Sequence, residues 1–523
     1  MVSLTEHLTA WARQRPQAPA VEFQRSVMTY AELDRASSAV AAALAAGGVS
    51  PGDRVGLWLR KSLESIVSVY GVLKAGAAYV PIDPSAPQAR AARIIADCDL
   101  TCIIANDDHV DLLMGLADET GAQWPVIAVG AQGADTAAGG RVTGWQAALD
   151  HAATALPAIG PDATAYILYT SGSEGIPKGV TISHANALAF VEWSVREFGM
   201  TTDDRVSSHA PLHFDLSILD LFATGLAGGC IVLIPEGQAG MGGVLNRLVA
   251  QREVTVWYSV PNALTRMLTA DGSELLASSA LRVVLFAGET FPVGSLRRLR
   301  HLLPGVELYN LYGPTETNVC TYHRVRDTDV APDRTEPAPI GRPCPYADAF
   351  IVDGQGRELA PEPGVTGELC VSGQSVMLGY WGDAAATGGR MLTLQRAAGE
   401  PVQVYRTGDI VRLDSELNYV FCGRDDDMVK IRGHRVELGE VESALAEAAN
   451  VAEAVCVVVG DDAEGRRIEA FVVPLSLPCD EDEVRRHCLT ALPRYMVPDR
   501  FRIVAELPRT QSGKLDRRAL LGV

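Results

Sequence analysis

A short apolar run that breaks into a loop rich in glycine and hydroxyl groups constrains this chain most. Residues 164–180 read TAYILYTSGSEGIPKGV. The first half has the bulky side chains of a buried strand, and the second half changes abruptly to turn-forming residues. Glycines let backbone N–H groups turn toward an anion, hydroxyls add donors, and a lysine supplies a compact positive charge. The pattern predicts a strand that leads into a phosphate-binding loop. The candidate phosphate-binding residues are Thr170, Ser171, Gly172, Ser173, Gly175 and Lys178.

This loop differs from the Walker type of nucleotide-binding loop. No Gly-Lys-Ser or Gly-Lys-Thr closes it, and Pro177 stands directly before Lys178. Loops rich in glycine and serine also occur as plain connections, here to a helix that Ser183 would cap. On these residues alone, a phosphate-binding loop and a simple connector both remain open.

Length, charge and cysteine usage limit the classes of protein to consider. With 523 residues, 47% of them hydrophobic, the chain is long enough for two or more domains. The net charge of −19 argues against a general affinity for nucleic acid or an anionic membrane. The ten cysteines are scattered without a CxxC pair, and the sequence has no leader segment and no run of 18 uncharged apolar residues. We therefore expect a cytoplasmic protein with no nucleic-acid partner and no membrane segment.

Alternating helical and strand-like runs indicate α/β layering. Residues 254–261 and 281–289 are predicted inner strands whose carboxyl ends face a ligand crevice. Residues 115–157 are rich in alanine and glycine and weakly patterned, so we expect a surface excursion there. From Val441 onward, a smaller region alternates helix and strand patterns, with residues 455–459 its clearest strand.

Residues 164–180 resemble, almost residue for residue, the phosphate loop of adenylate-forming enzymes, specifically the adenylation domains of nonribosomal peptide synthetases. Glu174 stands where that family usually has threonine. Seven motifs in the family's order extend the resemblance over nearly the whole chain. The resemblance implies the adenylate-forming enzyme fold, which is α/β with a large N-terminal multi-sheet adenylation core, residues 1–425, that holds the ATP and amino-acid sites. It also implies a small mobile C-terminal α+β lid domain, residues 426–523, with Asp426 as the hinge.

Residues 309–316, YNLYGPTE, combine aromatic side chains, a glycine turn, a hydroxyl and a carboxylate. Such a run could be only a tight turn, but it also suits a nucleotide and its metal. The resemblance implies that Asn310 and Tyr312 meet adenine, that Thr315 reaches the α-phosphate and that Glu316 binds Mg²⁺. The full implied ATP site consists of Thr170, Ser171, Gly172, Ser173, Gly175, Lys178, Gly288, Asn310, Tyr312, Gly313, Thr315, Asp409, Arg424 and Lys514.

The run of residues 423–440 is dense in charge and glycine, and without the resemblance it reads as a solvated linker. The resemblance makes Arg424 a second nucleotide contact and Gly433 part of a loop that swings toward an incoming thiol. Met428 replaces the glutamine common at its position. Lysines near a C-terminus are usually solvated, but Lys514 matches the family's mobile catalytic lysine.

Asp215 precedes a run with helical spacing, where an aspartate is most often a helix N-cap. The resemblance implies instead that Asp215 holds the α-ammonium group of an amino acid and that Phe214 lines the entry. The full substrate set carried over from the family is Phe214, Asp215, Leu216, Leu219, Tyr258, Leu285, Ala287, Leu311, Val319, Cys320 and Lys514. Since this pocket is apolar apart from its two charges, its substrate side chain must be small and uncharged. The set resembles that of stand-alone L-proline-activating enzymes that supply prolyl carrier proteins for pyrrole formation.

The implied chemistry is attack of a carboxylate on the α-phosphate of ATP, with charge neutralised by Mg²⁺ on Glu316, by Lys178 and by Lys514. The residues expected to act in catalysis are Lys178, Thr315 and Lys514. A carrier's phosphopantetheine thiol then takes the acyl group. No condensation or carrier-protein motif is found, so we expect a separate, stand-alone carrier protein as partner. Three alternatives stay open: activation of valine, isoleucine or pipecolate; an acyl- or aryl-CoA synthetase, against which Asp215 argues; and an inactive nucleotide-binding regulator, which would lose Lys514 or Glu316 first.

Overall fold

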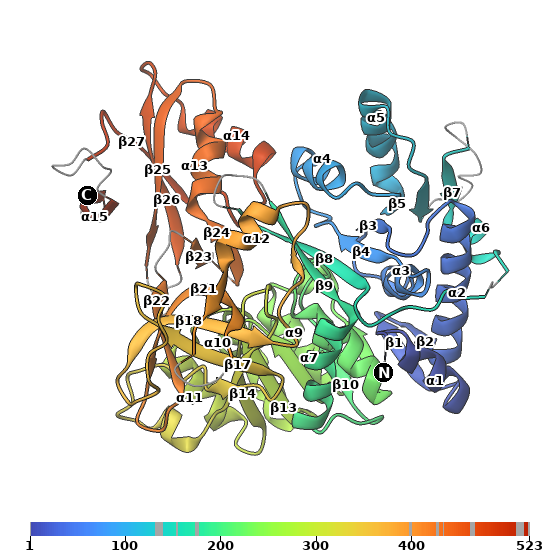
Figure 1. The fold of residues 1–523 in the computed structure, drawn as a ribbon, viewed down its shortest axis with the longest axis horizontal. Coiled ribbons are helices and arrows are strands. Elements are labelled where there is room, and N and C mark those ends of the chain that lie inside the picture. Colours follow the sequence, from blue (N-terminus) through green and yellow to red (C-terminus); the bar gives the residue numbers. More distant parts are fainter. Residues whose placement is uncertain are drawn as a thin grey trace.

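The computed structural model of the chain describes residues 2–130, 140–152, 155–172, 177–396, 400–424, 428–431, 433–460, 466–508 and 517–520. Within these residues a large body built on three sheets carries a smaller domain, labelled α13, α14 and β25 to β27 in Figure 1. Ser173, Gly175, Asp426 and Lys514 lie outside the described residues. So does the predicted domain boundary between residues 425 and 426, which stays a prediction.

The first sheet has eight strands and is mainly parallel. In spatial order its strands are β19 (Gly379–Tyr380), β9 (Lys178–Ser183), β8 (Thr164–Thr170), β4 (Ala78–Pro81), β3 (Arg54–Trp58), β5 (Cys102–Asn106), β6 (Val126–Val129) and β7 (Val142–Gly144). The inner strands are buried along nearly their whole length, which explains why they read as continuous apolar runs in the sequence.

The second sheet has nine strands and a parallel centre. In spatial order its strands are β16 (Arg342–Pro343), β15 (Thr321–Arg324), β14 (Glu307–Tyr312), β13 (Val283–Ala287), β12 (Val256–Ser259), β10 (Arg205–Ser208), β11 (Cys230–Leu233), β1 (Pro19–Phe23) and β2 (Ser26–Thr29). The predicted inner strands within residues 254–261 and 281–289 are confirmed as β12 and β13.

A third, antiparallel sheet completes the large body. It contains β17 (Ala347–Val352), β18 (Thr366–Gly373), β21 (Val402–Leu413), β20 (Met391–Leu394) and β22 (Tyr419–Arg424). The helices of the large body are α1 (Glu6–Gln14), α2 (Tyr30–Ala46), α3 (Leu63–Lys74), α4 (Gln88–Asp97), α5 (Val110–Thr120), α6 (Trp145–Leu149), α7 (His184–Glu197), α8 (Thr224–Ala227), α9 (Gly242–Gln251), α10 (Pro261–Thr269), α11 (Val293–Leu302) and α12 (Ala384–Arg390). The largest apolar core joins the first two sheets, with Tyr79 of β4 and Tyr258 of β12 both buried in it.

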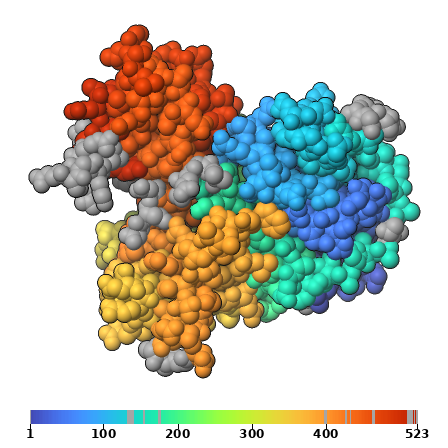
Figure 2. All heavy atoms as spheres, turned by 45° about the horizontal axis from the view of Figure 1, so that its top comes forward, coloured from blue at the N-terminus to red at the C-terminus, as the bar shows by residue number. Residues whose placement is uncertain are grey.

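The small domain has a core of its own, which includes Val436, Leu445 and Phe501. Its elements are the hairpin β23 (Met428–Ile431) and β24 (His434–Glu437), the three-stranded sheet β25 (Val451–Val459), β26 (Arg467–Pro474) and β27 (Arg500–Ile503), and the helices α13 (Leu438–Ala446), α14 (Glu481–Ala491) and α15 (Arg517–Leu520). The predicted strand at residues 455–459 is confirmed as part of β25. Figure 2 shows this domain, in red and orange, against the blue surface of the N-terminal part, where α14 contacts α4.

The connection after β8 differs from a direct strand-to-helix loop. Residues 178–183 form the antiparallel strand β9, and Thr170 of β8 pairs with Lys178 of β9, so Thr170 and Lys178 lie opposite each other at the end of this strand pair. The reason is that Val180, Thr181 and Ile182 are β-branched residues, which favour strands, and all three are buried. Ser183 caps α7 as predicted, in a capping box with Asn186.

The expected surface excursion over residues 115–157 was wrong for much of its length. Residues 126–129 and 142–144 are strands β6 and β7, which extend the first sheet by parallel pairing. All four residues of β6 are buried. Their short apolar pattern was hidden by the surrounding alanine and glycine, and tertiary pairing decided the strand.

Candidate active site

The carboxyl ends of the parallel strands in the second sheet surround a cavity of about 110 Å³, next to a larger one of about 720 Å³. Tyr258 of β12 and Ala287 of β13 border the smaller cavity, and Leu311 of β14 pairs with Ala287 and borders the larger one. Crevices at the carboxyl ends of strands are the usual ligand sites of parallel sheets.

Asp215 is half-buried at the wall of the smaller cavity, in the turn that precedes the π-helical segment Leu219–Ala223. Its Oδ2 accepts a hydrogen bond from Thr315 Oγ1 at 2.8 Å. Burial raises the pKa of Asp215, and the Thr315 hydroxyl and the Lys430 cation offset only part of that effect. The partly desolvated carboxylate can therefore gain most by pairing with a cation.

Most of the predicted substrate residues lie around Asp215. Phe214, Leu216, Tyr258, Ala287 and Val319 line the smaller cavity. Leu219, Leu285 and Leu311 are buried in the same apolar core, where Tyr258 pairs with Leu285 across two strands. Cys320 differs, since it is buried in a neighbouring core with Tyr312.

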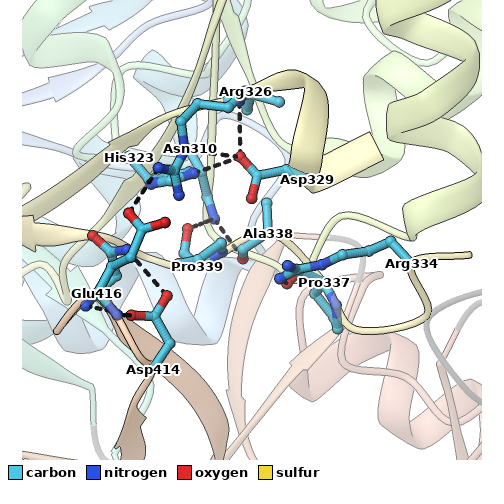
Figure 3. A network of polar contacts seen from close by, with 12 residues as sticks. Asn310, His323, Arg326, Asp329, Arg334, Pro337, Ala338, Pro339, Asp414 and Glu416 are labelled. Atoms are coloured by element: carbon cyan, nitrogen blue, oxygen red, sulfur yellow. Dashed lines mark hydrogen bonds and ion pairs between the residues drawn. The ribbon is translucent and has the colours of Figure 1, made fainter. Parts of the chain in front are cut away.

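The predicted adenine residues line the larger cavity together with Gly288 and Arg424. Figure 3 shows that the side chain of Asn310 points at the segment of residues 337–339. Its Nδ2 donates to the carbonyls of Pro339 at 2.9 Å and Ala338 at 3.4 Å. Since these carbonyls take the amide N–H groups, the orientation of the amide is set, with its oxygen as the acceptor.

Asp409 joins two further predicted nucleotide residues. It accepts a hydrogen bond from the hydroxyl of Tyr312 and forms an ion pair with Arg424, and both Asp409 and Arg424 are nearly inaccessible to solvent. This network brings β14, β21 and β22 together at the edge of the larger cavity.

Residues at both ends of the phosphate loop contact other parts of the chain. Ser171 Oγ donates to the backbone carbonyl of Arg435 at 2.9 Å. The Lys178 ammonium lies 5.6 Å from the centre of the Tyr380 ring, which gives a cation–π contact. Thr170, Ser171, Gly313 and Thr315 line the smaller cavity, so phosphate-binding candidates and Asp215 face the same space.

Glu316, the candidate metal ligand, is completely buried. It accepts from Tyr380 Oη at 2.7 Å and from Arg435 Nη1 at 2.9 and 2.8 Å. Burial by itself would raise the pKa of Glu316, but the Arg435 guanidinium, helped by Tyr380, outweighs it and holds the pKa below its usual value. Within the described residues no group of three or more His, Cys, Asp or Glu side chains gathers around a possible metal ion.

Sequence profiles of known families match both parts of the chain. The profile of the AMP-binding enzymes matches residues 8–381, and that of the AMP-binding enzyme C-terminal domain matches residues 440–514. The chain belongs to the AMP-binding enzyme family. The family and the fold class predicted from the motifs are thereby confirmed.

Two curated relatives match this AMP-binding enzyme over nearly their full lengths. One from Pseudomonas fluorescens is 38% identical over 99% of this chain and 99% of its own. One from Streptomyces coelicolor is 40% identical over 94% of this chain and 91% of its own. Both are named L-proline--[L-prolyl-carrier protein] ligase.

Solved structures share the fold. The Vibrio cholerae adenylation domain AlmE, in complex with glycyl-adenosine-5'-phosphate, superposes with a TM-score of 0.84 at 24% identity and covers 100% of this chain and 97% of its own. An NRPS protein containing adenylation and PCP domains gives a TM-score of 0.81 at 25% identity and covers 99% of this chain and 84% of its own. In the described residues of this AMP-binding enzyme, no helix is both long and apolar enough to cross a bilayer.

Sequence reasoning missed the residues that the β23–β24 hairpin brings into the site. Lys430 lines the smaller cavity near Asp215 and Asp409, and burial lowers its pKa while Asp409 opposes that effect. Arg435 pairs with Glu316, and His434 stacks on Tyr495 with 3.7 Å between ring centres. The sequence signal for these residues was the high density of charge in residues 423–440, but Lys430, His434 and Arg435 were not among the residues predicted there, which were Arg424, Asp426, Met428 and Gly433.

Proposed function

We propose that this AMP-binding enzyme activates L-proline with ATP, releases pyrophosphate and passes the prolyl group to the phosphopantetheine thiol of a carrier protein. The two full-length relatives named as L-proline--[L-prolyl-carrier protein] ligases carry this proposal. Support from the site comes from the half-buried carboxylate of Asp215, which lines the smaller cavity beside the apolar side chains of Phe214, Leu216 and Tyr258.

The proline pocket follows from that arrangement. The secondary ammonium of proline has two N–H donors, so the Asp215 carboxylate satisfies much of it while the ring packs on Tyr258 and the neighbouring apolar residues. An apolar wall distinguishes one methylene by only about 1–3 kcal/mol, so valine, isoleucine and pipecolate are the competitors to test.

ATP occupies the larger cavity in this proposal. The oxygen of Asn310 accepts from the adenine amino group, since the Asn310 nitrogen already donates to Ala338 and Pro339. Tyr312 and Gly288 flank the base, and Asp409 takes the ribose hydroxyls with Arg424 beside it. The phosphates are held by Thr170, Ser171, Gly172, Ser173, Gly175 and Lys178. Thr315 reaches the α-phosphate from its place beside Asp215.

The residues present fit Mg²⁺ held largely by phosphate oxygens. Glu316 supplies a single buried carboxylate that already binds a cation, and Mg²⁺ commonly takes one or two carboxylates and completes its shell with phosphate and water. When bound there, Mg²⁺ would neutralise phosphate charge. Glu316 would hold it, and Lys178 and Lys514 would add the remaining positive charge.

Two half-reactions then follow in turn. In the first, a proline carboxylate oxygen bonds to the α-phosphorus as its bond to the pyrophosphate oxygen breaks. In the second, the carrier's thiol sulfur bonds to the acyl carbon, AMP leaves with the carbonyl-bound oxygen, and the thiol proton is lost. We assign the adenylation half-reaction to a state in which Lys514 lies in the active site. We assign the thioester-forming half-reaction to the state seen here, in which the β23–β24 hairpin lies in the active site. Asp426 is the proposed hinge of a lid domain over residues 426–523.

Pyrophosphate exchange into ATP tests the proposal. We expect exchange with L-proline to exceed that with each of the other proteinogenic amino acids and with L-pipecolate. D-proline and a reaction without amino acid are the controls. The second step is tested with a holo carrier protein against free coenzyme A. Exchange that prefers another acid, or prolyl-CoA formed as fast as the carrier thioester, would contradict the substrate or the partner, respectively.

A further inference from the structure

The cation paired with Glu316 in this structure is Arg435 of the small domain. The Glu316 carboxylate is inaccessible to solvent, and both of its oxygens are within 2.9 Å of Arg435 Nη1 while Oε1 also accepts from Tyr380. A metal ion would need at least one of the oxygens that the guanidinium now occupies. A buried carboxylate is strongly destabilised when left without a cation, so one cation has to replace the other.

Arg435 also contacts the phosphate loop. Its backbone carbonyl accepts the hydrogen bond from Ser171 Oγ. A phosphate group bound in the loop would compete for that hydroxyl proton. Arg435 therefore binds both the Glu316 carboxylate, which is assigned to the metal, and the Ser171 hydroxyl, which is assigned to the phosphates.

Arg435 reaches these groups only when the β23–β24 hairpin is docked. The backbone N–H of Gly433 donates to the Glu289 carboxylate, and Gly433 has φ +85° and packs so closely on Val260 that a Cβ would lie 2.6 Å from its Cγ1. His434 lies edge-on to Phe214 and is stacked on Tyr495. The hairpin is thus held in one position by the large body on one side and the small domain on the other.

We propose that Arg435 exchanges with the metal cation on Glu316, so that docking of the β23–β24 hairpin and binding of Mg²⁺ with a polyphosphate exclude one another. The inference rests on the proposed function for its direction. Metal and pyrophosphate hold the hairpin out during adenylation, and their departure lets Arg435 take over the carboxylate and fix the state that accepts the thiol. Arg435 is a positioning residue in this scheme, because it acts through Glu316.

Hydrogen exchange of the full-length enzyme, read by mass spectrometry on peptides covering residues 428–437, tests the exclusion directly. The probe is Mg²⁺ with inorganic pyrophosphate, without amino acid or carrier protein. We expect the probe to raise the exchange rate of the hairpin about tenfold or more, within the usual range of coupling between two sites. Pyrophosphate with a chelator should have little effect. An unchanged exchange rate in the presence of the probe would overturn the proposal.

Variants separate the cation exchange from simple loss of a domain contact. Arg435→Met should abolish the response to the probe, whereas Arg435→Lys, which keeps the charge, should restore most of it. The matched control is Arg90→Met, which removes the buried Arg90–Glu440 ion pair between the same two domains without touching Glu316, and its response should persist. A response retained in Arg435→Met, or lost equally in Arg90→Met, would contradict the role of Arg435.

Metal affinity gives a second readout. With pyrophosphate present, Mn²⁺ binding followed by electron paramagnetic resonance should be about tenfold tighter in Arg435→Met, because the competing cation is gone. Glu316→Gln should weaken Mn²⁺ binding in both backgrounds. Equal Mn²⁺ affinity in the native enzyme and Arg435→Met would count against the exchange. Because no measurement uses proline, failure of proline activation would leave these results standing.

Discussion

The hydroxyl of Thr315 donates a 2.8 Å hydrogen bond to the carboxylate of Asp215, although the two residues are 100 positions apart in the chain. In the proposed function Asp215 holds the amino group of proline and Thr315 holds the α-phosphate of ATP. The two substrate sites are therefore in direct contact through one hydroxyl proton. This contact brings the proline carboxylate next to the phosphorus that it attacks, and proximity of that kind lowers the entropic part of the barrier.

Replacing Asp215 by alanine should nearly abolish proline-dependent pyrophosphate exchange. The ammonium group would be buried without a partner, at a cost of about 3–5 kcal/mol. ATP binding, measured by calorimetry, should stay close to native because the adenine and ribose residues lie elsewhere.

Tetrahydrofuran-2-carboxylate is the matched substrate for this variant, since it keeps the ring and the carboxylate but lacks the amine. It should be a poor substrate for the native enzyme and lose little more activity in Asp215→Ala. A preference of the native enzyme for this analogue over L-proline would refute the role of Asp215.

Proline activation should fall on acidification at a higher pH than an ordinary aspartate would cause. Burial raises the pKa of Asp215 above the usual value for an aspartate, despite Thr315 and Lys430, and Glu316 adds to the increase. A raised carboxyl pKa means that Asp215 takes up a proton earlier as the pH falls, and the neutral acid cannot pair with the ammonium group. We expect kcat/KM for proline, which reports the free enzyme, to decline before kcat/KM for ATP. The same acidic decline in Asp215→Asn would assign it to another group.

Gly433→Ala should slow thioester formation by about tenfold or more and spare adenylation. The φ of +85° is unfavourable for alanine, and its Cβ would lie 2.6 Å from Val260 Cγ1, so the hairpin could not dock as it does here. Single-turnover transfer from preformed prolyl-AMP to the carrier measures this step, and pyrophosphate exchange measures the other. Gly388→Ala is the control, because its Cβ would meet nothing within 4 Å. Equal damage to both half-reactions would contradict the assignment of the hairpin.

Lys514→Ala should mainly damage adenylation, by roughly 10²- to 10³-fold, the scale for removing one preorganised donor. Lys514 lies outside the described residues, so its role remains a prediction from the sequence. Supplying prolyl-AMP should rescue most of the transfer step. Loss of transfer to the same extent would show that Lys514 acts in both steps or supports the fold.

Local chemistry in the sequence determined the family, the α/β class and most candidate residues. The sequence predicts the glycine and hydroxyl pattern after Thr170, the helix cap at Ser183 and the strand at residues 455–459, because each depends on residues that are neighbours in the chain. The resemblance then placed Asp215, Asn310 and Asp409 at cavities that the structure contains. Their roles, and those of Lys178 and Glu316, await the experiments above.

Tertiary structure alone decided which charges meet. Residues 423–440 contain charges without a regular period. Nothing in that order indicates that Arg435 faces Glu316, 119 positions earlier, or that Lys430 lines the cavity beside Asp215. The pairing of Val126–Val129 with β5 could not be predicted from the sequence either, because it depends on residues 102–106, which lie outside the local pattern. Long-range pairs form when the folded domains exclude water and bring distant groups together, and a buried charge selects its partner by position in space rather than by distance along the sequence.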